Sequence, residues 1–544
     1  MNNKIAKSGA VLSLLIVSSN LFAQTGGSSS STYIIYALLL IAALLILGAV
    51  MMIGDSMVSI KAKELGVEDS VEKLSIFPSA QELFGQRAEG APSNKKVHFL
   101  KKGFDIKLEG EAVYQVDENH AVSRFAVQPK NFIGMSPIPK VVVEVGDEVK
   151  AGDHLFFDKK NPDVKYVAPV SGEVVAVNRA EKRSISEVVI LADKEIKYRK
   201  FGEFDIEKAD REQLVNFLLD AGVWPHIRQR PYDIVADPSI KPKAIFITTF
   251  DTAPLAPDLD LVVAGREDEF QMGLDILGKL TDGKVHLSVN AKDTDPSVAY
   301  TAASGVEVHY FHGPHPAGNV GVQIHHIDAI NSGEKVWTLG VQDVCTVGAL
   351  FIEGIYDAER IIALTGDELS NPRYITTYLG ANIGDLVKDN LKNDHVRYIS
   401  GDVLSGKQKT QDQFLNFFDD QMTVVEEGDE YEAFGWLLPS SPRPSLSPTF
   451  VSNLIGTSYK ANTNTHGEKR AFVVTGQYEE VMPMDIFPQH IMKSILINDF
   501  ERMEGLGILE LSEEDVALCE FACTSKQPLQ ELLREGLDLM RDQE

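Results

Sequence analysis

The chain of 544 residues contains only three cysteines, Cys345, Cys519 and Cys523. Three thiols are too few for a disulfide framework or for an iron–sulfur cluster held entirely by cysteine. This scarcity suits a reducing compartment. Cys519 and Cys523 have the spacing that places two side chains on one face of a helix. We expect a structural apolar pair there; the alternative, a metal site, would have at most these two thiolates as ligands.

The chain also lacks an excess of positive charge. Lysine and arginine number 52 against 79 aspartate and glutamate residues, which gives a formal net charge of -27. Binding a polyphosphate needs a basic surface, so we expect no nucleic acid partner. Hydrophobic residues make up 44% and charged residues 24% of the chain. A composition of this kind folds, and a chain of this length divides into several domains.

A glycine-rich turn is missing where a nucleotide-binding fold would carry one. Strands are expected at 243–250, 284–289 and 306–311, with a helix at 267–280, and this alternation predicts a Rossmann-like α/β domain over 201–345. The turn after the first strand reads Thr-Phe-Asp-Thr-Ala-Pro, so phosphate binding is not expected there. Asp251, in that turn, lies where open α/β sheets bind ligands.

The other domains are predicted from strand and helix patterns. Short β-branched runs broken by Gly-Asp and Pro-Val-Ser-Gly predict a barrel-sandwich domain of the biotinyl/lipoyl kind over 97–200. No lysine stands at a hairpin tip as a carrier would need, so no covalently bound cofactor is expected. A strand, a turn, a second strand and a short helix predict a β-grasp (SLBB-like) domain over 346–410, and a β-rich continuation follows over 411–484. Helical periodicity, with Ser512 as N-cap, predicts a C-terminal helical domain over 485–544.

Two apolar segments open the chain. The first, 1–23, has two lysines and an apolar stretch, which predicts a signal-like segment; an uncleaved short membrane segment is the alternative. The second, 33–53, has no charge and would span about 31 Å as a helix, which predicts a transmembrane helix. The lysines that follow it place the main body in the cytoplasm. Residues 57–96 are expected to form a tether.

Several phrases carry a resemblance to one family. They are Lys-Lys-Gly-Phe-Asp-Ile at 101–106, Asp-Lys-Lys-Asn-Pro at 158–162, His-Gly-Pro-His-Pro-Ala-Gly at 312–318, Phe-Gly-Trp at 434–436, Tyr-Glu-Glu-Val-Met-Pro-Met-Asp at 478–485 and Leu-Cys-Glu-Phe-Ala-Cys at 518–523. In this order, from Val97 to the end, the chain resembles NqrA, the large peripheral subunit of the sodium-translocating NADH:quinone reductases. The resemblance excludes the first 96 residues.

The resemblance implies a role inside a respiratory complex of the bacterial inner membrane. Five other subunits, chiefly the membrane subunit NqrB, would be its partners and would carry FAD, FMN, riboflavin and a 2Fe-2S cluster. This chain would contribute to the quinone-reduction end, coupled to sodium export, without catalytic residues of its own. One alternative is a flavin- and cluster-bearing electron-input subunit of a ferredoxin oxidoreductase (RnfC-like). Another is a membrane-anchored scaffold or ligand-binding protein without enzymatic activity.

The loop at 312–318 is the candidate site. Its prolines and glycines exclude a helix, and it follows an expected strand. His312, Gly313, His315 and Gly318 are the candidate contacts to a quinone or a partner, with an imidazole able to donate a hydrogen bond or a proton to a quinone carbonyl. A purely structural loop is the alternative. His309, His312, His325 and His326 lie close in sequence but lack a carboxylate partner at a recognised spacing, so no metal site is expected.

Overall fold

The computed structural model describes residues 36–37, 39–43, 88–92, 95–431, 435, 442–446 and 458–543. The chain forms two compact units, Met1–Arg87 and Ala88–Glu544. Residues 36–37 and 39–43 are helical. The signal-like segment 1–23, the rest of the expected transmembrane helix 33–53 and most of the tether 57–96 lie outside the described residues. Within the described part of the chain, no helix is both long and apolar enough to cross a membrane.

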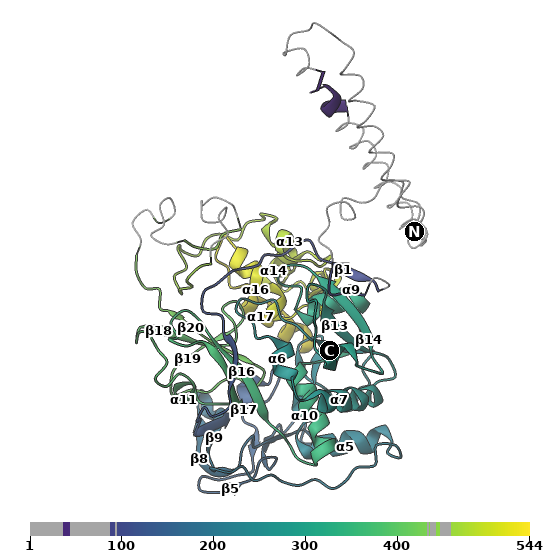
Figure 1. The fold of residues 1–544 in the computed structure, drawn as a ribbon, viewed down its shortest axis with the longest axis vertical. Helices are drawn as coiled ribbons and strands as arrows, with labels where there is room; N and C mark the ends of the chain where they lie inside the picture. Colours follow the sequence, from purple (N-terminus) through teal and green to yellow (C-terminus); the bar gives the residue numbers. More distant parts are fainter. Residues whose placement is uncertain are drawn as a thin grey trace. The chain divides into compact units, whose positions relative to one another are not determined.

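A seven-stranded sheet organises the α/β domain (Figure 1). Strands β14, β13, β12 and β15 run parallel, β1 adds to β14, and two antiparallel strands extend the other edge. In spatial order the strands are β1 (Val97–Phe99), β14 (Glu307–His312), β13 (Val285–Asn290), β12 (Ile245–Thr248), β15 (Val336–Leu339), β10 (Arg228–Arg230) and β11 (Ile234–Val235). The chain leaves β12 toward β13 on one side and returns to β15 on the other, so the topological switch point lies between β12 and β15.

Helices cover both faces of this sheet because β12 is apolar on both of its faces. Ile245 and Ile247 pack into the large core with α7 (Glu267–Leu280) and α10 (Val341–Glu353). Phe246 points the other way, into a smaller core with α9 (Val320–Asp328). Burial on both sides is the pattern of a parallel strand. The short helices α5 (Arg211–Ala221), α6 (Leu259–Val263), α8 (Val298–Thr301) and η3 (Trp224–His226) complete the domain.

The β-grasp domain contains a six-stranded sheet, drawn in green with one dark strand in Figure 1. Its strands in spatial order are β19 (Lys407–Lys409), β18 (Val396–Ser400), β20 (Gln421–Glu426), β16 (Glu359–Thr365), β17 (Arg373–Tyr378) and β2 (Val113–Asp117), and α11 (Ile383–Leu386) follows β17. The hairpin of β16 and β17 and the helix after it are those predicted from the sequence. Two strands come from elsewhere. β2 lies in the range assigned to the barrel-sandwich domain, and β20 lies beyond residue 410, the expected end of the domain.

Two small antiparallel sheets form the barrel-sandwich domain. One contains β3 (Arg124–Val127), β9 (Ile185–Ala192), β8 (Gly172–Arg179) and β5 (Glu148–Val149), and the other contains β4 (Lys140–Val141), β6 (His154–Phe157) and β7 (Lys165–Val167). Short 3-10 turns lie at η1 (Pro129–Asn131) and η2 (Glu181–Arg183). Lys159 and Lys160 are exposed in the loop between β6 and β7.

The C-terminal helices build a core of their own, drawn in yellow in Figure 1. They are α13 (Gln477–Val481), α14 (Pro488–Leu496), α15 (Phe500–Gly505), η4 (Ile508–Glu510), α16 (Glu513–Ala522) and α17 (Leu529–Arg541). Ser512 caps α16 as predicted, in a reciprocal pair with Asp515. Helix α13 falls in the range expected to be β-rich. It belongs with the helices because Tyr478 is buried against α16.

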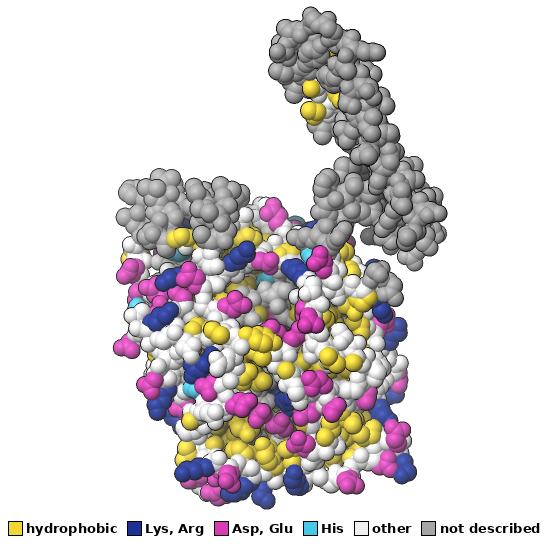
Figure 2. Space-filling model, viewed as in Figure 1, with side chains coloured by type: hydrophobic (Ala, Val, Ile, Leu, Met, Phe, Trp, Pro, Cys, Tyr) yellow, Lys and Arg dark blue, Asp and Glu magenta, His cyan; other side chains and the backbone are white. Residues whose placement is uncertain are grey.

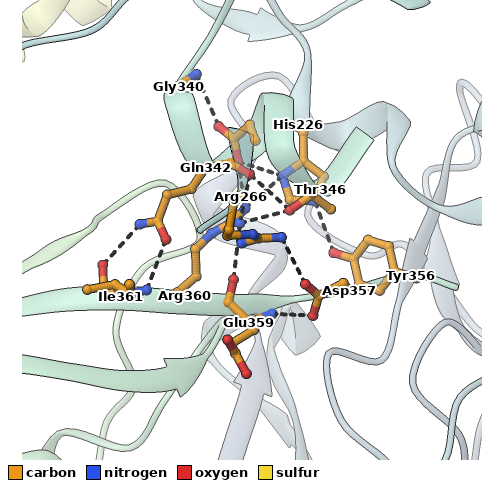
Figure 3. A network of polar contacts seen from close by, with 11 residues as sticks. His226, Arg266, Gly340, Gln342, Thr346, Tyr356, Asp357, Glu359, Arg360 and Ile361 are labelled. Carbon is orange, nitrogen blue, oxygen red and sulfur yellow. Dashed lines mark hydrogen bonds and ion pairs between the residues drawn. The ribbon is translucent and has the colours of Figure 1, made fainter. Parts of the chain in front are cut away.

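A buried polar network joins the α/β domain to the first β-grasp strand (Figure 3). The Arg360 guanidinium on β16 donates to the Asp343 carboxylate on α10 at 2.7 Å and to the Thr346 hydroxyl at 2.8 Å. The same carboxylate lies 2.7 Å from Nδ1 of His226, whose side chain is fully buried. The amide of Gln342 pairs with both backbone groups of Ile361. Asp343 thus supplies the negative charge that permits burial of Arg360.

We expect Asp343→Asn to lower the free energy of unfolding by roughly 3–5 kcal/mol, because it leaves the buried Arg360 charge without its nearest anion. Trp224 and Trp337 are fully buried in the α/β domain, so urea unfolding followed by tryptophan fluorescence reports on this junction. Asp282→Asn is the control. It removes an exposed pair with Lys241, in which the aspartate side chain is 79% exposed, and should cost less than about 1 kcal/mol. Equal effects of the two substitutions would contradict the role given to Asp343.

Candidate functional site

The candidate loop connects the carboxyl end of β14 to α9, so it lies at the edge of the sheet where open α/β folds bind ligands. His312 is the last residue of β14, and Asn319 is the N-cap of α9. The backbone N–H of His315 donates to the Asp105 carboxylate at 2.8 Å, and the His315 carbonyl accepts from Phe104 at 2.9 Å. The loop is therefore fixed by the segment that follows β1.

His315 is buried, with 4% of its surface exposed, and its two ring nitrogens differ. Nδ1 lies 3.1 Å from the Thr252 hydroxyl, which accepts the Gly318 N–H at 2.9 Å and has its own proton to donate. With that proton given to Nδ1, the neutral imidazole carries its hydrogen on Nε2. Nε2 finds no hydrogen-bond partner among the described residues. Burial lowers the pKa of His315, against the opposing effect of Asp251, Asp402 and Asp105, which favours the neutral form.

Two glycines let this loop approach its neighbours. A Cβ on Gly318 would lie 2.7 Å from the Thr252 nitrogen and 2.9 Å from the Asp251 Cα, both backbone atoms. A Cβ on Gly313 would lie 2.7 Å from the Leu100 Cβ. The first contact holds the loop against the turn after β12, and the second holds it against the end of β1. Both glycines therefore position His315 without contacting a ligand through a side chain.

The structure separates His312 from His315. The His312 ring packs against Phe99 of β1, with ring centroids 5.3 Å apart, and its pKa is lowered by burial and by Lys292. His312 does not line the cavity that His315 faces, whereas Gly318 does. Of the two histidines predicted as contacts, only His315 therefore meets this cavity.

The cavity beside His315 has a volume of about 220 Å³ and lies at the switch point of the sheet. Thr248 at the end of β12 and Gly340 after β15 contribute one wall. The loops of the β-grasp domain and the start of α16 contribute the others. Its acidic lining comes from all three domains, namely Asp251, Asp402, Asp419, Asp420 and Glu514, with Arg228 as the basic side chain among the lining residues.

Several of these carboxyl groups hold a proton more tightly than usual. Withdrawal from water raises the pKa of Glu514 to about 7, and Asp515 beside it acts in the same direction. Desolvation also raises the pKa of Asp420 to about 7, with Asp343 adding to the effect. The pKa of Asp251 is raised by desolvation and by Asp402, although its side chain opens to the cavity. The cavity thus combines an imidazole donor with carboxyl groups that can exchange protons near neutral pH.

A second, larger cavity of about 430 Å³ adjoins the first, since Phe250, Asp251, Pro257 and Leu259 line both. It is also acidic and contains three tyrosines, Tyr114, Tyr300 and Tyr374. Asp260 and Asp293 share a hydrogen bond there, and desolvation together with that bond raises the pKa of Asp260 to about 7. A shared proton between neighbouring carboxyl groups explains the shift.

The surface agrees with the exclusion of nucleic acid. On the described part of the face drawn in Figure 2, basic side chains are interspersed with acidic ones. A polyphosphate backbone needs clustered basic side chains.

The remaining candidate side chains have local partners. His325 binds the Glu510 carboxylate at 2.7 Å through Nδ1, and its Nε2 accepts the Asp485 N–H at 3.0 Å. His326 lies 2.7 Å from the Pro483 carbonyl. Cys519 and Cys523 are both buried and unpaired. Each contacts Tyr478, Cys523 through the phenol oxygen at 2.8 Å and Cys519 through the backbone carbonyl at 3.7 Å.

Sequence reasoning identifies His315 and Asp251 but misses the other acidic residues of the cavities. Asp402 and Glu514 are far from His315 in the chain, and only the packing of the β-grasp loops and α16 against the sheet brings them together. Asp260 has a usable signal, because it follows Asp258, the N-cap of a helix that starts just after β12.

Three family models match the chain. The model described as the NqrA N-terminal barrel-sandwich hybrid domain matches residues 99–193, the NqrA second alpha/beta domain matches 209–356, and the NQRA C-terminal domain matches 361–411.

Curated relatives match at greater length, and all three described here are named as the NqrA subunit of a Na(+)-translocating NADH-quinone reductase. The protein of Saccharophagus degradans is 39% identical over 442 residues, covering 80% of this chain and 98% of the relative. That of Yersinia pestis is 38% identical over 444 residues, with 80% and 98% covered. That of Vibrio alginolyticus is 37% identical over 443 residues, with 81% and 98% covered. Among solved structures, an NAD+-reducing [NiFe]-hydrogenase in the air-oxidized state matches with a TM-score of 0.33 and 12% identity, over 61% of each chain.

Gly318→Ala should displace the loop from the turn after β12, because the added Cβ meets backbone atoms that cannot rotate away. We expect a loss of about 1–3 kcal/mol in the free energy of unfolding, as is usual for overpacking a tight contact. Gly278→Ala is the matched control, since that glycine is exposed on α7 with nothing within 4 Å of the added Cβ. Alanine favours a helix, so the control should be neutral or slightly stabilising. A neutral Gly318→Ala would show that the loop does not need this contact.

Asp260 should make stability depend on pH in a defined direction. Its pKa is raised to about 7 in the folded chain, whereas an unfolded aspartate titrates near about 3.9. The folded chain binds the extra proton, so this contribution to stability is present at low pH and is lost as the pH rises from about 4 to about 7. The free energy of unfolding of Asp260→Asn should therefore gain on the native chain over this window and run parallel to it above. Parallel curves throughout would contradict the shared proton.

Proposed function

Because the chain belongs to the NqrA family of Na(+)-translocating NADH-quinone reductase subunits, we propose that it serves the quinone-reduction end of that enzyme and that His315 is its hydrogen-bond donor to the quinone. The chain is a subunit of an oxidoreductase complex, and the match to curated NqrA subunits extends over 98% of their length. This family favours the leading interpretation over an electron-input subunit of the ferredoxin oxidoreductase kind and over a scaffold without enzymatic activity.

The single observation that carries the quinone proposal is the unpartnered Nε2 of His315. A buried donor without a partner is costly, and native proteins keep such groups mainly where a ligand or water completes them. A quinone offers a carbonyl oxygen as acceptor. The hydrogen bond would strengthen as negative charge develops on that oxygen during reduction, so the donor favours the reduced form over the oxidised one.

The acidic lining supports the same role, since a quinone becomes a quinol by taking up electrons and protons together. Asp420 and Glu514 have pKa values raised to about 7, so they can carry protons at neutral pH and release them toward a charged oxygen. His312 and Gly313 then act on the other side of the loop, where they hold it against β1 and the segment after it. Gly318 brings His315 against Thr252.

The electrons would come from partner subunits. We propose that five other subunits, mainly the membrane subunit NqrB, complete the complex and that FAD, FMN, riboflavin and a 2Fe-2S cluster belong to those partners. The described residues contain three free cysteines, all buried, two of them in contact with Tyr478. Buried thiols in apolar surroundings are poor cluster ligands, which supports a chain without a cluster of its own.

Membrane attachment is part of the proposal. A respiratory complex that pumps sodium acts across the bacterial inner membrane, and the uncharged run 33–53 is long enough to anchor this chain there with its main body on the cytoplasmic side. Expression of the full chain and of a version that lacks 1–56, followed by membrane fractionation, tests this anchor. Equal recovery of both versions with the membrane would place attachment on the partners alone.

His315→Phe in the assembled complex should lower kcat/KM for quinone about tenfold, because one hydrogen bond is worth about 1 kcal/mol or slightly more. Oxidation of NADH by an artificial electron acceptor should not change, since that reaction does not need the quinone. His315→Gln retains an N–H donor and should recover part of the loss. His395→Gln serves as control, because the His395 side chain is 65% exposed at the edge of the β-grasp sheet. If His315→Phe reduces quinone at the native rate, the cavity is not the quinone site.

A further inference from the structure

A second cluster of polar side chains lies on the α9 face of the seven-stranded sheet, near the amino-terminal edge of its strands. β13 and β14 run parallel there, with His286 opposite Glu307 and Ser288 opposite His309. Side chains two residues apart on a strand point to the same face, so Glu307 and His309 share a face, and both flank His286. The sheet register alone therefore gathers two imidazoles and one carboxylate.

The three side chains are close enough to share an ion. Nδ1 of His286 lies 2.9 Å from Nε2 of His309, and one ligand atom of each of the three residues lies within 4.8 Å of the others. Ligand atoms around a tetrahedral zinc ion stand about 3.4 Å apart, given bonds of about 2.0–2.2 Å. Small side-chain rotations would close the remaining difference.

The surroundings suit a ligand site more than a simple imidazole pair. Phe246 stacks on His286 at 4.7 Å between ring centroids and holds the ring in place. His286 is 5% exposed, whereas the Glu307 side chain is 44% exposed, so the cluster is closed toward the core and open toward solvent. Lys284 lies 2.6 Å from the Glu307 carboxylate, and His98 and His326 stand further out on the same face.

The imidazoles are in the form that binds metals. Burial lowers the pKa of His309 to about 4, with His286 acting in the same direction, and burial lowers the pKa of His286. Both rings are therefore neutral at physiological pH, and a metal need not compete with bound protons.

We propose that His286, His309 and Glu307 form a binding site for a divalent zinc ion, with solvent water as the fourth ligand. Two imidazoles and a carboxylate are a donor set that zinc accepts in a tetrahedral site with one open position. The ion would tie β13 to β14 at the edge opposite the acidic cavities. The sequence prediction of no metal rests on His309, His312, His325 and His326. It does not include His286, whose neighbour across the sheet supplies the missing carboxylate.

The test uses the full chain, purified without a histidine tag and freed of metal by a chelator that is then removed. Titration with zinc chloride, followed by calorimetry, should show saturable binding of one ion per chain. The thermal midpoint should rise with zinc, because an ion that binds only the folded chain stabilises it. Cobalt(II) in place of zinc should give the visible absorption of a tetrahedral site. Absence of saturable binding would overturn the proposal.

Variants locate the ion. His309→Gln should weaken zinc binding by more than about 100-fold, since loss of even an outer-shell partner weakens a site about 10–100-fold. Glu307→Gln, at an exposed position that tolerates substitution, should also weaken it at least about tenfold. His395→Gln, far along the chain and 65% exposed, should leave the affinity unchanged.

A fourth variant covers the case in which His309→Gln unfolds. His309→Cys supplies a thiolate ligand, so cobalt bound at this site should gain a sulfur-to-metal charge-transfer band in the near ultraviolet. Native affinity in Glu307→Gln, together with no such band in His309→Cys, would show that any bound ion lies elsewhere and would overturn the proposal.

Discussion

The pairing of two buried arginine side chains holds the domains of this chain together. Arg230 on β10 is 0% exposed and Arg360 on β16 is 2% exposed. Arg230 donates to Asp515 at 2.8 Å and to Glu514 at 2.5 Å, which ties the sheet to the start of α16. Arg360 is tied in the same way to α10 through Asp343. A buried charge is tolerated only with its partners in place, so both junctions require one arrangement of the domains.

The acidic cavities follow from these junctions. Glu514 pairs with Arg230 and also lines the cavity beside His315, while Asp420 lies close enough to Arg360 for its titration to be affected. Gly321 on α9 shows how tightly this region is packed, because a Cβ there would lie 2.3 Å from the Asp515 carboxylate. The carboxyl groups that hold protons near neutral pH are therefore neighbours of the ion pairs that fix the domains. Proton binding in the cavities and the attachment of α16 share the same side chains.

The sequence predicts local structure better than it predicts which residues meet. Helix α7 begins and ends where its apolar spacing predicts, and Ser512 caps α16 as its Ser-Glu-Glu-Asp phrase indicates. The sequence pattern assigns β2 to the wrong sheet, because strand patterns carry no information about the partner strand, and its parallel pairing with β17 is a long-range choice. His315 is identified because prolines and glycines mark its loop. Its separation from His312 depends on a reversal of the chain that spacing does not encode.

One further consequence follows from β1, which covers the outer edge of β14. Its three residues pair in parallel with residues 310–312, and Leu100 continues the ladder by donating to the His312 carbonyl at 2.8 Å. If a shortened version of the protein began after Phe99, β14 would become an edge strand with unpaired backbone groups, which is a template for intermolecular pairing and aggregation. The start point for a well-behaved recombinant fragment therefore lies upstream of Val97, even though the family phrases begin only after it.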